Sequence, residues 1–157
     1  MATASRFAIR LADGDIAGWR WTNAKGPRLI FAHANGFCAA AYRPMLDAVA
    51  AEAEIIAPDL RGHGQTRLPA DPARHRSWRV FAADLAKLVD EVRADDPARP
   101  LFAAGHSMGA VSLMLAAEDG ADLDAVFALD PVLLPEWVSW SQRSPFAGLF
   151  ANANPMS

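Results

Sequence analysis

The chain has 157 residues, 52% of them apolar, and a formal net charge of -3. So many apolar residues exclude a disordered or fibrous chain and are enough for the core of one domain. The slightly negative charge offers no basic surface for nucleic acid. Cys38 is the one cysteine, which excludes an internal disulfide and a four-thiolate metal site and fits a reducing compartment.

The amino-terminal residues, "MATASRFAIR", lack the apolar segment of a signal peptide. Nowhere does the sequence reach the ~18 consecutive apolar residues of a membrane-spanning helix. We therefore expect a soluble, cytoplasmic protein whose partners include neither nucleic acid nor a membrane.

The first elements in chain order are a hairpin and two strands separated by a helix. Residues 6–11 and 16–22 alternate apolar and polar side chains around the turn signal Asp13-Gly14, which predicts a β-hairpin. Residues 28–33 and 54–58 are short apolar runs typical of buried strands. Between them, apolar side chains recur at helical spacing, at Tyr42, Met45, Leu46 and Val49.

The second half of the chain continues the alternation of helices and strands. Ser77 is a candidate N-cap for a helix whose apolar stripe comprises Phe81, Leu85, Leu88, Val89 and Val92. A strand over 100–107, an apolar helix over 108–118 and a strand over 125–129 follow. Because parallel strands need crossover helices and appear as continuous apolar runs, the pattern predicts an α/β fold with a parallel sheet.

The stretch "GHSMG", residues 105–109, lies between a predicted strand and a predicted helix. In this context a serine between two glycines indicates a nucleophile elbow, a turn too sharp for bulky flanking residues. The turn exposes the serine hydroxyl above the carboxyl end of the sheet, beside the amino end of the helix. We predict that Ser107 is a nucleophile and that the Met108 N–H faces the developing oxyanion.

Three motifs resemble the α/β-hydrolase superfamily in sequence and in their order along the chain, and the resemblance covers nearly the whole chain. They are "GHSMG", "HANGF" at residues 33–37, and "PDLRGHGQT" at residues 58–66. The resemblance implies that "HANGF" is the oxyanion loop and that the Asn35 N–H is the second donor, although Ala34 stands where glycine is usual. Asparagine is common in such turns because it tolerates left-handed backbone.

These residues are suited to acyl transfer. A serine hydroxyl needs a base and donors aimed at the tetrahedral oxygen, and the N–H groups of Met108 and Asn35 are the candidate donors. A serine also argues against the superfamily's dehalogenases and epoxide hydrolases, which use aspartate. We therefore expect an esterase- or lipase-like hydrolase of a small-molecule substrate, with carbon–carbon hydrolysis and perhydrolysis as related activities, and no cofactor or metal.

The base is not evident in the sequence. In the superfamily the triad runs Ser, then Asp or Glu, then His, but no histidine follows Ser107. His33 is expected to support its own loop by hydrogen bonding, and the ring of His106 is expected to point away from Ser107. Asp130, at the end of the last strand, is a candidate for the acid and equally a plain strand terminator.

The expected domain organisation follows from this gap. Residues 1–131 are predicted to form the N-terminal part of a hydrolase core whose sheet stops before its last strands. Residues 132–157 are predicted to be the start of a truncated cap. A second polypeptide segment would then supply the histidine and complete the fold. The alternative is a noncatalytic fragment, or a module that binds small apolar molecules without turning them over.

Overall fold

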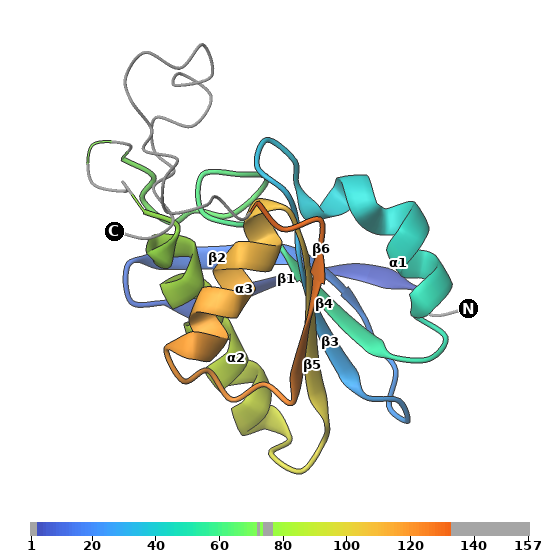
Figure 1. Cartoon of the computed structure of the whole chain (residues 1–157). Coiled ribbons are helices and arrows are strands. Elements are labelled where there is room, and N and C mark those ends of the chain that lie inside the picture. Colours follow the sequence, from blue (N-terminus) through green and yellow to red (C-terminus); the bar gives the residue numbers. More distant parts are fainter. Residues whose placement is uncertain (1–2, 72, 74–76, 133–157) are drawn as a thin grey trace.

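A computed structural model of the chain describes residues 3–71, 73 and 77–132. They form one six-stranded sheet with the strand order β1-β2-β4-β3-β5-β6 (Figure 1). The strands are β1 (Ala4–Leu11), β2 (Gly14–Trp21), β3 (Arg28–Ala32), β4 (Glu54–Pro58), β5 (Leu101–His106) and β6 (Ala125–Leu129). The helices are η1 (Ala39–Tyr42), α1 (Arg43–Val49), α2 (Arg79–Asp95) and α3 (Met108–Glu118).

The topology confirms the predicted α/β fold. β1 and β2 form the expected antiparallel hairpin, and β2 also pairs antiparallel with β4. From β3 onward the strands are parallel, with β3 between β4 and β5, and β6 beside β5. The carboxyl ends of four parallel strands therefore meet along one edge of the sheet, where open α/β sheets bind ligands.

Helices cover both faces of the sheet. α2 and α3 lie on one face, while η1 and α1 lie on the other (Figure 1). The α2 stripe is the apolar one predicted, with Leu85, Leu88, Val89 and Val92 buried among core residues. α3 is apolar on nearly all sides and buried along most of its length, as a helix between a sheet and a second helix must be.

Two details of the helices differ from the sequence prediction. Ser77 is not the N-cap of α2: the helix begins at Arg79 after Trp78, and Ser77 Oγ accepts the Arg79 N–H within the preceding turn. In α1 only Leu46 is buried, whereas Met45 and Val49 are exposed. Helical spacing identified the helix correctly, but this short helix turns just one of its apolar rows to the sheet.

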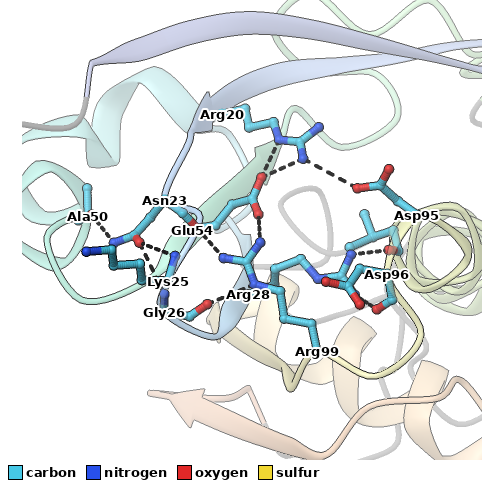
Figure 2. Close-up of polar contacts among 11 residues, drawn as sticks. Arg20, Asn23, Lys25, Gly26, Arg28, Ala50, Glu54, Asp95, Asp96 and Arg99 are labelled. Carbon is cyan, nitrogen blue, oxygen red and sulfur yellow. Dashed lines mark hydrogen bonds and ion pairs between the residues drawn. The ribbon is translucent and has the colours of Figure 1, made fainter.

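A partly buried ion network stabilises the opposite edge of the sheet, where the parallel strands begin (Figure 2). The Glu54 carboxylate, almost fully buried at the start of β4, accepts from Arg20 Nε and from Arg99 Nη1, both at 2.6 Å. The fully buried guanidinium of Arg28 donates to main-chain carbonyls at the end of α2, those of Val92 and Asp96. These contacts connect the strands to the segments that precede and follow them, and they lie away from the edge at which the parallel strands end.

The outer side of β6 is the least covered part of the sheet. Phe127 and Leu129 are 55% and 44% exposed, and Phe127 contacts Phe102 of β5 with ring centroids 6.3 Å apart. Within residues 3–132, apart from the gaps named above, no strand pairs with the outer edge of β6. The expected cap, residues 132–157, lies outside the described residues except for Val132. None of the described helices is long and apolar enough to cross a membrane.

Gly109 and Gly105 allow α3 to approach the sheet closely. A Cβ at Gly109 would collide with the main-chain carbonyl of Ala32 in β3, and one at Gly105 would lie 2.5 Å from the Ala110 nitrogen. These are contacts with backbone, which no side-chain rearrangement relieves. The glycines that flank Ser107 are therefore required by packing.

Gly109→Ala is expected to destabilise the fold by about 3 kcal/mol or more, since overpacking against backbone displaces α3 from the sheet. Gly120→Ala is the matched control, because Gly120 has nothing within 4 Å of the added Cβ and bears only the strain of a φ of +97°. This control should cost about 1–2 kcal/mol. Urea denaturation of both variants measures the difference, and equal losses would contradict the close-approach argument.

Candidate active site

Ser107 occupies a strained turn between β5 and α3. Its φ of +53° and ψ of -114° lie in a region that residues other than glycine seldom adopt. The turn is held from both sides: the Ser107 N–H donates to the Leu129 carbonyl at 3.0 Å, and the Ser107 carbonyl accepts from the Val111 N–H at 3.2 Å. Strain retained by surrounding contacts is typical of functional residues.

The hydroxyl of Ser107 has no hydrogen-bond partner within the described part of the chain, and it does not cap α3. The Met108 N–H at the start of this 11-residue helix likewise has no acceptor among the described residues. The first N–H groups of a helix have no partner inside the helix, and the helix dipole favours negative charge beside them. A half-buried hydroxyl and a free N–H group thus lie next to each other in the chain.

The loop after β3 orients a second free N–H group. The Ala34 carbonyl accepts from His33 Nδ1 at 2.8 Å and from the Phe37 N–H at 3.2 Å. Because a trans peptide is planar, the Asn35 N–H points in the direction opposite to that carbonyl. It has no acceptor among the described residues. Gly36, with a φ of +76°, supplies the left-handed residue of this loop, so the expected left-handed role of Asn35 is wrong.

Tyr42 links the two loops that carry these N–H groups. Its hydroxyl accepts the Ala34 N–H at 3.2 Å and lies 2.7 Å from His106 Nδ1. Ala34 is buried, and its φ is not positive. The position therefore does not require glycine. The ring of His106 is therefore engaged with Tyr42, as expected for a side chain that does not reach Ser107.

The loop after β4 is held by two buried charged residues. Asp59 accepts the N–H groups of Ala39 and Gln65, both at 2.8 Å. Arg61 donates two parallel hydrogen bonds of 2.8 Å to Asp84 of α2, and this pairing raises the pKa of Arg61. The motif "PDLRGHGQT" thus braces the loop against both helical layers.

His33 is buried and neutral. Its Nε2 accepts the Leu60 N–H at 2.8 Å, so its proton is on Nδ1, which donates to Ala34. Burial lowers the pKa of His33 to about 4, and the hydrogen bond to Ala34 opposes this shift only partly. The expectation that His33 supports its own loop is confirmed.

The predicted site residues lie at the ends of neighbouring strands. Asn35 follows β3, Ser107 and Met108 follow β5, and Asp130 follows β6. The Ser107–Leu129 hydrogen bond places Asp130 directly after the carbonyl that holds the elbow, and Asp130 has a strained φ of +46°. No described histidine other than those engaged with loops lies near this edge, and His75 is outside the described residues. The described residues contain no cluster of three metal-ligating side chains.

Sequence reasoning missed Tyr42, Asp59 and Arg61. Asp59 and Arg61 belong to the motif "PDLRGHGQT", which the sequence identifies without indicating a role for either side chain. Tyr42 was interpreted as one position of an apolar helical row. The available signal is that a buried hydroxyl or charge needs a hydrogen-bond or ion-pair partner. The sequence does not say which residue that partner is.

The chain matches the sequence profile of the alpha/beta hydrolase family over residues 29–156. It belongs to the alpha/beta hydrolase family. Solved structures with this fold include Epoxide Hydrolase A from Mycobacterium thermoresistibile, with a TM-score of 0.69, 24% identity, and coverage of 95% of this chain and 44% of that one. An N-acyl homoserine lactonase superposes with a TM-score of 0.68 at 21% identity, covering 80% and 44%.

Curated relatives match part of this α/β-hydrolase chain. The monoglyceride lipase of Rattus norvegicus is 32% identical over 99 residues, which are 62% of this chain and 32% of the lipase. The magnesium-chelatase 30 kDa subunit of Rhodobacter capsulatus is 36% identical, covering 59% and 31%. Protein phosphatase methylesterase 1 of Bos taurus is 31% identical, covering 56% and 23%. The chain therefore spans about a third or less of the length of these relatives.

The neutral state of His33 predicts a pH-dependent stability. The unfolded chain binds a proton at His33 below about pH 6.5, whereas the folded chain resists protonation until about pH 4. Stability from this residue is thus complete above about pH 6.5 and is lost as the pH falls toward 4. Between pH 7.5 and 5 the loss is ~2 kcal/mol.

Urea denaturation at the two pH values measures this effect in the wild type and in His33→Gln, which cannot titrate. The wild type should lose ~2 kcal/mol more than the variant over this interval. Parallel pH dependence in both proteins would show that His33 is not held neutral.

Proposed function

We propose that this α/β-hydrolase chain carries the nucleophile and oxyanion hole of a serine hydrolase that cleaves an ester-type acyl substrate. The observation that carries the proposal is the strained turn at Ser107. In the part of the chain that the structure describes, it leaves a hydroxyl without a partner next to the free N–H of Met108. Strained backbone of this kind is concentrated at functional sites. The proposal concerns the type of reaction and does not specify the acyl group of the substrate.

In the proposed reaction Ser107 Oγ attacks the substrate carbonyl carbon while a base takes the hydroxyl proton. The carbonyl oxygen becomes an oxyanion that accepts hydrogen bonds from the N–H groups of Met108 and Asn35. Each such donor contributes on the order of 3 kcal/mol in the transition state. The leaving alcohol takes the proton back, and water then hydrolyses the acyl-serine by the same steps.

The base in this proposal is a histidine from a second polypeptide segment. The printed sequence has no histidine after Ser107. His33 and His106 are engaged with the Ala34 carbonyl and with Tyr42. Asp130 is the candidate acid that would orient the incoming imidazole, because it is exposed, strained and adjacent to the elbow.

The outer side of β6 supports the idea of a second segment. An apolar strand edge with Phe127 and Leu129 exposed invites pairing with another strand. Met45 and Val49 of α1 are exposed too. Phe127 pairs with Ala104 of β5, which shares a core cluster with Leu46 of α1, so Phe127 lies on the face of the sheet that α1 covers. A segment that adds a parallel strand and a helix there would bury this surface and bring a histidine to the carboxyl edge.

The names of the relatives support an ester substrate. A monoglyceride lipase and a methylesterase are each about 30% identical to part of this chain. The epoxide hydrolase has the same fold, but the superfamily resemblance implies an aspartate nucleophile for that chemistry, and this chain has Ser107. The absence of a base among the described histidines favours the second candidate function, a noncatalytic module that binds small apolar molecules.

Ser107→Ala tests the nucleophile. In the assembled protein, purified from its source with every associated segment, the variant should lose at least ~10³-fold of its turnover of short p-nitrophenyl esters. Its unfolding transition should not change. Ser5→Ala, an exposed serine on β1, is the control and should retain full turnover. Ester hydrolysis that survives in Ser107→Ala would rule out Ser107 as the nucleophile.

Native mass spectrometry of the source protein tests the second segment. The proposal predicts a complex in which the 16.9 kDa chain is bound to, or continuous with, a segment that contains a histidine. The apolar surface along β6 should keep the two together at nanomolar concentration. A stable 16.9 kDa monomer without ester turnover would instead favour the binding module.

A further inference from the structure

Two histidines join the loop after β3 to the loop after β4 in opposite directions. His33, on the first loop, accepts the Leu60 N–H of the second loop through Nε2 at 2.8 Å. His63, on the second loop, accepts the Gly36 N–H of the first loop through Nε2 at 3.2 Å. The two rings meet edge to face, with centroids 5.0 Å apart.

The protonation of the two rings follows from these contacts. A ring nitrogen that accepts an N–H carries no proton, so in each neutral ring the proton is on Nδ1. His33 Nδ1 donates to the Ala34 carbonyl at 2.8 Å, and His63 Nδ1 donates to the Arg61 carbonyl at 2.9 Å. Each histidine therefore uses one nitrogen within its own loop and the other across to the neighbouring loop.

The contacts act on the two peptide planes that flank Asn35. His33 holds the plane between residues 34 and 35 through the Ala34 carbonyl, and His63 holds the plane between 35 and 36 through the Gly36 N–H. With both planes fixed, the Asn35 N–H has one direction available. Asn35 itself is exposed, so packing around its side chain does not determine this direction.

We propose that His33 and His63 are positioning residues that form a reciprocal clasp and orient the Asn35 N–H toward the oxyanion. Their effect on reactivity rests on the proposed function of Ser107; the clasp itself rests on the four hydrogen bonds alone. The clasp needs an acceptor at each Nε2 position, which a side chain of similar size without that acceptor does not supply.

His63→Gln and His63→Leu form a matched pair for the test, because glutamine can place an oxygen near the Nε2 position and leucine cannot. In the 157-residue wild type, nitrogen NMR of the imidazoles should show both His33 and His63 protonated on Nδ1 at pH 7.5. Hydrogen exchange of the Gly36 amide should be slow in the wild type and His63→Gln, and at least tenfold faster in His63→Leu. Circular dichroism establishes that both variants fold.

Reactivity of Ser107 provides the second readout. In the assembled protein, which includes the segment that supplies the base, a fluorophosphonate that modifies Ser107, followed by mass spectrometry, should react about tenfold or more slowly with His63→Leu, since a misdirected oxyanion donor loses part of its ~10²-fold effect. His63→Gln should restore most of the rate. If the His63→Leu variant does not fold, His63→Asn replaces it in the comparison with His63→Gln. The proton positions in the wild type then test the clasp without any variant.

The two proposals fail in different ways. Proton positions on Nε2, or equal Gly36 exchange in the glutamine and leucine variants, would overturn the clasp whatever the chain's activity. Equal labelling rates in those variants would overturn its role in reactivity. Absence of Ser107 labelling in the assembled wild type would count against the nucleophile, and the NMR results would then decide on the clasp alone.

Discussion

The left-handed turn at Ser107 is the constraint on which the arrangement of this edge depends. A serine with a φ of +53° stays in that conformation only if its neighbours hold it there. Gly105 and Gly109 let the helix return at once against the backbone of β5 and β3. The same geometry leaves the serine hydroxyl and the Met108 N–H without partners among the described residues. One turn therefore accounts for the close packing of α3 and for the free hydrogen-bonding groups beside it.

Buried polar side chains determine the conformation of the two neighbouring loops, as Gly105 and Gly109 determine that of the turn at Ser107. Asp59, Arg61 and His33 are almost fully buried, and each contacts main-chain or charged groups of another element. Buried polar groups are stable only when paired, so each of them limits the loop to few conformations. In the proposed clasp, His33 of this network acts together with His63 to set the direction of the Asn35 N–H.

The sequence predicted what depends on local pattern. Asp13-Gly14 identified the hairpin, continuous apolar runs identified the parallel strands, and the glycine spacing around Ser107 identified the elbow. It did not predict contacts between distant residues, such as that of Tyr42 with His106, 64 positions apart. It also did not predict that Met45 and Val49 are exposed, because periodicity finds an apolar row without saying whether anything covers it.

The central claim is that the Ser107 hydroxyl and two backbone N–H groups converge on one reacting centre. A crystal structure of the assembled protein, including the segment that supplies the base, after reaction with a fluorophosphonate tests it most directly. The account predicts phosphorus bonded to Ser107 Oγ, with the phosphoryl oxygen at hydrogen-bond distance, about 2.7–3.1 Å, from both the Met108 and the Asn35 nitrogens. An adduct on another residue, or a phosphoryl oxygen directed away from either N–H, would contradict it.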